Sequence, residues 1–292
     1  TVKWMLSGSY DENSGRVGHA GNLFAGIQRN NMYAGWVTKW VSRHYQPGMG
    51  FVAAHNFINH NPGGYFIWRP KKEKSLIRRA DPGLFVDYFQ NASDGKLQQL
   101  EILIFPIYLW LRDNTFIRAE VVPTWQHIDF DFAPLGIPIA QGDYAYLRYF
   151  LTITSDQSRK FSANTGARIG QFYNGNLLTF NAGIRFAPSH HAALTFDYEL
   201  NEAQNLGAAS TDKTVHLYSG GLRLALNARL QGTAFYQFNS LDKTGRWNAR
   251  LSWEYQPLSF LFLVFNDTRS DLGLNRFQNT GVIAKLNWMK QF

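Results

Sequence analysis

Apolar and polar residues alternate along most of the chain with a period of two. In the run 178–186, leucine, phenylalanine, alanine and isoleucine alternate with threonine, asparagine, glycine and arginine, and the runs 194–200 and 248–255 repeat the pattern. Successive side chains of a β-strand point to opposite faces, so each run predicts a strand with one apolar or aromatic face and one polar face. Helical spacing is not sustained anywhere.

Turn-forming residues separate the alternating runs at short intervals. Between the shorter turns lie longer polar segments, at 11–20, 43–56, 91–96, 128–142, 201–213, 240–246 and 267–279. Short and long connections therefore take turns, which is typical of a transmembrane β-barrel with short periplasmic turns and longer outer loops. The pattern predicts an all-β fold, a transmembrane antiparallel up-and-down β-barrel of about 16 strands, within a range of 14 to 18. We expect residues 1–292 to form this single barrel.

A soluble β-sandwich or propeller also alternates, because one face of each strand is buried in its core. Two features favour a membrane barrel. Most of the nine tryptophans fall near predicted strand ends, where interfacial aromatic girdles lie. The opposite faces carry ionised residues in mid-strand, which would be costly in a dry core.

The last predicted strand carries a further signal. Leu286, Trp288 and the terminal Phe292 resemble the C-terminal motif that the outer-membrane assembly machinery recognises, whereas Lys290 departs from it. We expect these residues to act as an assembly signal.

Composition excludes several classes of protein. The chain is 45% hydrophobic and 16% aromatic, with a mean hydropathy of −0.29, so its apolar residues are dispersed. No segment approaches the roughly 20 consecutive apolar residues of a membrane-spanning helix. Cysteine is absent, which excludes disulfides, thiolate zinc sites and cysteine nucleophiles. The net charge of +8 is compatible with nucleic acid or with anionic lipid, but the basic residues are scattered, and we expect no nucleic-acid partner.

Ionisable residues of both signs share the expected inward faces of the strands. These candidate lumen-lining residues are Arg118, Glu120, Arg148, Arg185, Asp197, Glu199, Arg223, Arg250 and Glu254. They predict either a water-filled lumen that controls permeation or a closed interior in which arginine–carboxylate pairs link adjacent strands. A barrel of about 16 strands is wide enough for an aqueous channel unless something plugs it.

The segment 100–111 breaks the alternation. Leu103, Phe105, Ile107 and Leu109 would make its inward face apolar, and Pro106 cannot donate a hydrogen bond in mid-sheet. Two interpretations stay open. The inward face packs against a folded-in loop or another chain, or the strand contains a local bulge with an apolar patch.

No motif singles out a catalytic, metal or cofactor site. Asp197 and Glu199 lie two residues apart on one strand face, roughly 7 Å from one another, a spacing within the range of glycoside hydrolysis but common on any polar face. The eight histidines are dispersed, and His190-His191 is typical of a solvated turn. No nucleophile elbow, phosphate loop or dinucleotide fingerprint occurs. We therefore expect no enzyme, no metal and no cofactor.

Several segments resemble a family of large bacterial outer-membrane proteins of unknown function. The resemblance is carried by Gly170-Gln-Phe-Tyr-Asn-Gly-Asn-Leu-Leu-Thr-Phe, Phe186-Ala-Pro-Ser-His-His-Ala-Ala-Leu-Thr-Phe-Asp-Tyr-Glu, Tyr236-Gln-Phe-Asn-Ser, Asn248-Ala-Arg-Leu-Ser-Trp-Glu-Tyr-Gln-Pro and Leu261-Phe-Leu-Val-Phe-Asn-Asp. Earlier in the chain, Gly48-Met-Gly-Phe-Val-Ala-Ala-His-Asn-Phe is similar to a Gly-Phe-Val segment of that family.

The resemblance implies a barrel in the bacterial outer membrane, in contact with its lipid, the barrel assembly machinery and other envelope proteins. In that family the barrel follows an N-terminal domain similar to a family 9 carbohydrate-binding module, so we expect Thr1 to lie inside a longer protein. The functional expectation is a pore or transport component of a glycan-related or envelope machine. The first alternative is a non-conducting barrel that anchors or scaffolds a complex. The second, less favoured by the sequence, is an outer-membrane hydrolase.

Overall fold

The computed structural model describes residues 1–12, 14–48, 50–72, 74–272 and 275–290. Its regular structure in this part of the chain is β-strand, with one 3₁₀ turn, η1, at Pro134–Gly136. The strands are β1 Val2–Asp11, β2 Arg16–Gln28, β3 Met32–Val41, β4 Phe57–Phe66, β5 Ile77–Ala80, β6 Gly83–Asn91, β7 Leu97–Leu111, β8 Phe116–Ile128, β9 Gly142–Thr154, β10 Phe161–Phe172, β11 Gly175–Ser189, β12 Ala192–Leu206, β13 Thr211–Ala225, β14 Leu230–Asn239, β15 Thr244–Gln256, β16 Ser259–Leu272 and β17 Asn275–Asn287.

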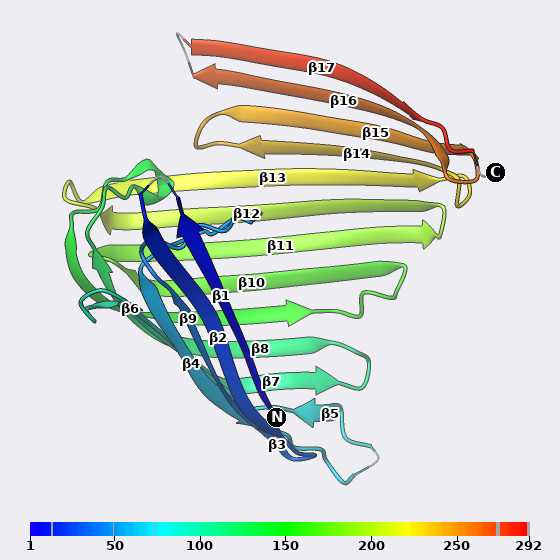
Figure 1. Ribbon diagram of the computed structural model, residues 1–292. Coiled ribbons are helices and arrows are strands. Elements are labelled where there is room, and N and C mark those ends of the chain that lie inside the picture. The colour runs from blue at the N-terminus through cyan, green and yellow to red at the C-terminus, as the bar shows by residue number, and fades with distance from the viewer. Residues whose placement is uncertain (13, 49, 73, 273–274, 291–292) are drawn as a thin grey trace. The chain divides into compact units, whose positions relative to one another are not determined.

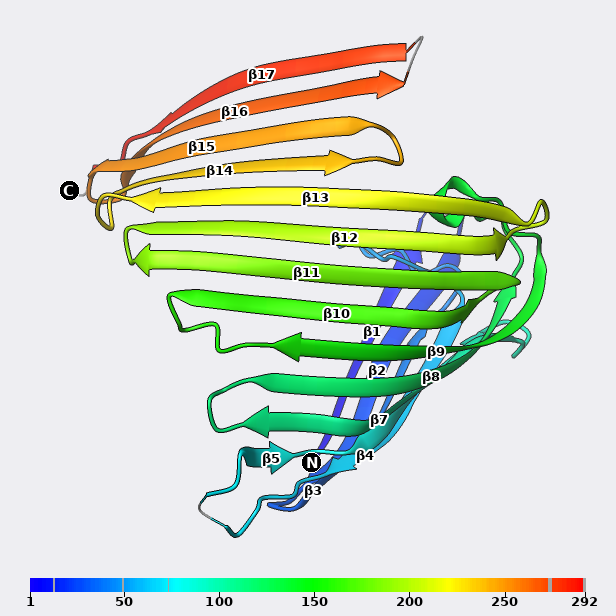
Figure 2. The same ribbon diagram turned by 180° about the vertical axis from the view of Figure 1, so that it is seen from behind.

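The chain forms two compact units. Unit 1 comprises Thr1–Leu151, Arg168–Asn176 and Asn205–Thr211, and unit 2 comprises Thr152–Ala167, Leu177–Gln204 and Asp212–Phe292. Each unit is built from antiparallel strands that run up and down in chain order, as the arrows in Figures 1 and 2 show. The all-β, antiparallel, up-and-down fold class predicted from the alternation is confirmed.

In unit 1 the antiparallel ladder runs β1-β2-β3-β4-β6-β7-β8. Strands β5 and β6 both pair with β7, β5 against Leu109–Leu111 and β6 against Leu97–Phe105. Between them, the Asp81 amide still donates to the Tyr108 carbonyl at 2.8 Å, but Pro82 has no N–H to donate. β5 and β6 are therefore two halves of one strand interrupted at this proline, and the 17 labelled strands of the described chain make 16, the number that the sequence predicts.

In unit 2 the ladder runs β13-β14-β15-β16-β17. These five strands lie side by side in both ribbon views (Figures 1 and 2). Their register is regular except for one bulge between Glu254 and Gln256. Regular register keeps all side chains of one parity on one face, and this property organises the faces described below.

The predicted connections are confirmed in part. Residues 42–56 and 129–141 are long connections, as predicted from the polar segments there. The longer loops predicted at 201–213 and 267–279 are wrong, because β12, β13, β16 and β17 run through most of these residues, whereas at 240–246 residues 240–243 form a connection and β15 begins at Thr244. Polar residues at these strand ends continue the ladder hydrogen bonds, so the loss of apolar alternation does not mark the end of the strand.

The irregular segment 100–111 contains a bulge. The register of β7 against β8 shifts between Ile104 and Ile107, around Pro106. As a result Phe105 is 4% exposed, whereas Ile107, predicted on the same face, is 43% exposed. An extra residue in one strand moves every following side chain of that strand to the opposite face of the sheet. The predicted common face of Leu103, Phe105, Ile107 and Leu109 is therefore wrong. The interpretation of the segment as a local bulge is confirmed.

Candidate functional site

The strands of unit 2 divide their side chains between an apolar face and a polar face. The register places Leu222 and Leu224 of β13, Gly232 and Ala234 of β14, Ala249 and Leu251 of β15, Leu263 and Phe265 of β16, and Val282 and Ala284 of β17 on the apolar face. The positions between them form the opposite face, which is polar in β13–β15, with Arg223, Thr233 and Arg250 in adjacent strands, and carries Val264 and Ile283 in β16 and β17. The apolar face therefore continues across all five strands, and the polar face across the first three.

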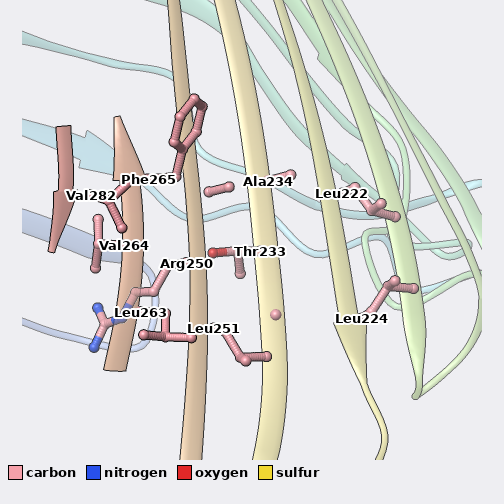
Figure 3. Close-up of a pocket in the computed structure, with 12 residues that line it drawn as sticks. Leu222, Leu224, Thr233, Ala234, Arg250, Leu251, Leu263, Val264, Phe265 and Val282 are labelled. Atoms are coloured by element: carbon pink, nitrogen blue, oxygen red, sulfur yellow. The ribbon is translucent and has the colours of Figure 1, made fainter. Parts of the chain in front are cut away.

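A shallow groove of about 390 Å³ runs over the apolar face (Figure 3). Its floor is made by small residues, Gly232, Ala234 and Ala249, and larger apolar side chains such as Leu224 and Phe265 stand beside it. Leu224 is 51% exposed and Val282, at the far side, is 73% exposed. Large exposed apolar side chains in adjacent strands would be unfavourable against water, so this face requires an apolar neighbour.

Aromatic residues border the apolar face at both ends. Tyr236 and Trp247, with ring centroids 4.6 Å apart, lie at one end, and Trp253 and Tyr255, 6.0 Å apart, lie at the other. The six residue steps from Trp247 to Trp253 span about 20 Å at strand rise. An apolar band of about 25 Å between two aromatic girdles is the surface that a membrane β-barrel presents to lipid.

Six of the candidate lumen residues lie in unit 2, all on the polar face: Arg185, Asp197, Glu199, Arg223, Arg250 and Glu254. They do not pair with each other in the described chain. Arg223 Nη2 donates to the His190 carbonyl at 3.1 Å, and the Arg250 guanidinium lies 4.8 Å from the Phe262 ring centre.

The carboxylates of this polar face have local roles. The Glu199 carboxylate accepts a hydrogen bond from Asn201 at 2.7 Å, and Glu254 accepts one from the amide of Leu258 at 2.9 Å, which closes the β15–β16 turn. Asp197 and Glu199 share a strand face as predicted, but the structure gives them no common partner. Nothing in this geometry points to acid–base catalysis by the pair.

The other three candidates, Arg118, Glu120 and Arg148, lie in unit 1. Arg118 Nε is 3.1 Å from Glu120 Oε1 on the same face of β8, and Glu120 is 4% exposed. The Arg148 guanidinium lies 5.5 Å from the Phe150 ring centre and 5.3 Å from that of Phe172. Its Nε and Nη2 atoms are buried, and no described residue accepts a hydrogen bond from them.

Sequence reasoning missed part of this polar network. Asp87 of β6 accepts hydrogen bonds from Asn59 and Asn61 of β4, both at 2.5 Å, and lies opposite Glu101 of β7. Glu101 lies opposite Thr124 of β8 in the next pair. A single aspartate inside the aromatic run 85–89 was the available signal, since a charge in a largely apolar strand requires buried partners.

Aromatic side chains fill the same face of unit 1 beside this network. Phe85 stacks on Phe105 with ring centres 5.7 Å apart, and Phe105 contacts Tyr108 at 5.6 Å. They line a cavity of about 250 Å³ together with Arg79 and Asp81, whose Nε and Oδ1 atoms are 2.6 Å apart. The face that would be a polar lumen is here largely packed by protein.

The connection 129–141 of unit 1 folds against two turns. Ile137 and Ile139 are 3% and 5% exposed, and Tyr173, in the turn after β10, contacts Phe132 at 5.6 Å. Burial raises the pKa of the Tyr173 phenol. The turn residue Gly207 has a φ of +75°, and a Cβ there would approach the Pro138 carbonyl to 2.6 Å, so this contact requires glycine.

The predicted assembly signal is described in part. Leu286 lies in β17, and Trp288 follows the strand, with exposed fractions of 68% and 67%. Phe292 lies outside the described residues. The role of these residues stays a prediction.

Within the described ranges, no group of three or more histidine, aspartate or glutamate side chains is placed to hold a metal ion. In the same part of the chain, no helix is long and apolar enough to cross a membrane.

Comparison with known families and with curated proteins finds no match to this chain.

Proposed function

We propose that this chain crosses the bacterial outer membrane as a closed β-barrel of 16 strands. The observation that carries the proposal is the apolar face of unit 2, continuous over five strands and bordered by the aromatic pairs Tyr236–Trp247 and Trp253–Tyr255. An even number of antiparallel strands supports closure, because the first and last strands can then pair antiparallel. Closure also removes the unpaired edges that a bilayer does not tolerate.

The same proposal gives the partners of the chain. Outer-membrane lipid would cover the apolar face, and the barrel assembly machinery would insert the chain with Leu286, Trp288 and Phe292 as its signal. Other outer-membrane or periplasmic proteins join these partners if the barrel belongs to a larger envelope machine. The link to glycan uptake rests on the resemblance alone.

Within this location we propose that the barrel is a pore for small polar solutes. Support comes from the polar face of unit 2, where Arg185, Arg223 and Arg250 form no ion pair with a described carboxylate. Unpaired cations on one face of a sheet require water or an anion beside them. Rings of such charges select ions in other pores.

The test is conductance across planar bilayers by the purified chain. Heat-modifiable migration in detergent gels and retention in the membrane fraction establish first that the barrel is folded. We then expect stepwise currents, and the double variant R223E/R250E should shift the ion preference at least several-fold toward cations. Lys243→Glu, at a turn, should leave it nearly unchanged. A folded barrel that carries no current at any voltage would contradict the pore.

A second candidate is a non-conducting barrel that anchors or scaffolds a complex. The observation that favours it is the packed face of unit 1, with Phe105 and Glu120 each only 4% exposed. Absence of current together with a stable co-purifying envelope protein would support this candidate. An outer-membrane hydrolase would be supported only by an activity that is lost in D197N or E199Q.

A further inference from the structure

A cavity of about 370 Å³ lies between two turns of unit 2. The first turn, 155–160, joins β9 to β10, and the second, at His190 and His191, joins β11 to β12. The lining residues are Gln157, Ser158, Arg159, Lys160, Arg185, Ala187, Pro188, Ser189 and His190. The cavity is distinct from the groove on the apolar face, and neither residue of the ion-preference variant lines it, although Arg223 contacts one of its walls.

The lining of this cavity is cationic. Arg159, Lys160 and Arg185 contribute three formal positive charges, and no aspartate or glutamate lines the cavity. The nearest acidic residue in the turn, Asp156, accepts hydrogen bonds from the Ser158 amide and hydroxyl and lies 3.8 Å from Arg159 Nε. Within the described chain the side chains of Lys160 and Arg185 have no hydrogen-bond or ion-pair partner.

The turns are tied together, so the cations are held near one another. The Ala187 amide donates to the Lys160 carbonyl at 2.6 Å, which joins the two sides of the cavity. The Ser162 hydroxyl donates to Gln157 at 3.2 Å, and the Ala163 amide donates to the Ser155 hydroxyl at 2.7 Å. Of the three cations only Arg159 has an acidic ion-pair partner among the described residues, so a bound anion would lower the electrostatic cost of placing Lys160 and Arg185 beside it.

A third arginine acts on the same turn from a neighbouring strand. Arg223 Nη2 donates to the His190 carbonyl at 3.1 Å, which fixes the position of the turn that forms one wall. Arg223 itself does not line the cavity, so it acts on the site only through the position of this wall.

We propose that this cavity binds a phosphate group, of the kind carried by a phosphate monoester. A phosphate monoester offers three acceptor oxygens and up to two negative charges. The positive charges and N–H donors of Lys160 and Arg185 complement these properties. The Ser189 hydroxyl, which accepts from the His191 amide, and the second hydrogen of Gln157 Nε2, whose first is donated to the Ser155 carbonyl, add neutral donors around it. The proposal goes beyond the pore, because the site is formed by turns of one unit and does not require conduction.

The experiment measures phosphate binding by the full chain folded in zwitterionic detergent, by calorimetry at constant ionic strength. We expect inorganic phosphate to bind, and the double variant K160Q/R185Q to weaken binding at least tenfold. The matched control K243Q/R246Q removes the same charge from residues outside the cavity and should change affinity less than twofold. The charge-conserving variant K160R should keep binding within about threefold of the unchanged chain.

A second arm distinguishes a soluble phosphate from a lipid-borne one. The chain is placed in vesicles of zwitterionic lipid that contain a phosphate-monoester lipid, and binding of that lipid is compared with that of inorganic phosphate. Phosphate binding that depends on Lys160 and Arg185 in either arm supports the site. The arm in which it occurs shows whether the bound phosphate is soluble or carried by a lipid. Binding in neither arm overturns it, as does an equal loss in K160Q/R185Q and K243Q/R246Q. Conduction without phosphate binding would support the pore and contradict this site. Phosphate binding without conduction would support this site and contradict the pore.

Discussion

The polar faces of the two units differ in how their charges are satisfied. In unit 1, Glu120 is buried beside Arg118, and Asp87 is held by two asparagine amides. In unit 2, the Arg185 side chain has no hydrogen-bond or ion-pair partner among the described residues, and the Arg250 guanidinium lies against the Phe262 ring instead of a carboxylate. The same alternating sequence pattern therefore produces a face with buried, partnered carboxylates in one unit and, in the other, a face whose arginines and carboxylates do not pair with each other among the described residues.

The difference shows that the face on which a side chain lies and the environment of that face are determined separately. Strand parity decides which side chains share a face, but the neighbours across the strands decide whether that face is dry or wet. Aromatic neighbours such as Phe85 and Phe105 exclude water in unit 1, so charges there need protein partners. The following substitutions test this contrast.

Phe105→Ala should have the largest effect. It removes a ring that is 4% exposed and stacked on Phe85, so we expect a loss of about 4 kcal/mol in the free energy of unfolding. Urea unfolding of the chain in lipid vesicles measures it. Ile107→Ala, beyond the bulge and on the other face, should cost only about 1 kcal/mol. Equal losses at the two positions would show that the face of unit 1 is not packed.

Glu120→Gln should come next. Loss of the carboxylate leaves Arg118 half-buried without its counter-charge, and we expect a loss of about 3 kcal/mol in the same unfolding measurement. The matched change in unit 2 is Asp197→Asn, which removes an exposed carboxylate and should cost less than about 0.5 kcal/mol. A large effect at Asp197 would mean that the polar face of unit 2 is as closed as that of unit 1.

Ala249→Arg tests the apolar face of unit 2. A cation in the middle of a lipid-facing band should cost about 2 kcal/mol in vesicles, whereas the adjacent Asn248→Arg, on the polar face, should be nearly neutral. The measurement is again urea unfolding, with refolding yield in vesicles as a second readout. If both variants behave alike, the apolar face does not face lipid.

Arg250→Ala should have the smallest effect. The contact of its guanidinium with Phe262 is partly exposed, so we expect a coupling of about 0.5 kcal/mol in a double-mutant cycle with Phe262→Leu. A coupling of several kcal/mol would indicate a dry environment, and the contrast between the units would then fail at this position.

The sequence was informative about strands and uninformative about their ends. Alternation located the β-structure and the count of 16, because a period of two is imposed by the pleat itself. It misplaced the ends near 201–213 and 267–279, because polar residues continue a ladder as readily as apolar ones. It also could not show that Pro82 interrupts one strand, while Pro106 lies at a bulge in the next.

The candidate site was predictable to a similar degree. All six candidates of unit 2 lie on the polar face, because facing follows from parity alone within a regular strand. The partners of Arg118 and Asp87 differ in how far along the chain they lie. Arg118 pairs two residues away on its own strand, but Asp87 meets asparagines almost thirty positions earlier in the chain, and no local pattern encodes that contact.

The sequence by itself thus determined that the chain forms antiparallel strands with one apolar and one polar face, because the geometry of a strand converts order along the chain directly into facing. Only the tertiary structure decided which charges are neutralised, where a bulge reverses a face, and that Lys160 and Arg185 line one cavity. These properties depend on register between strands, which is set by many weak cross-strand contacts acting together.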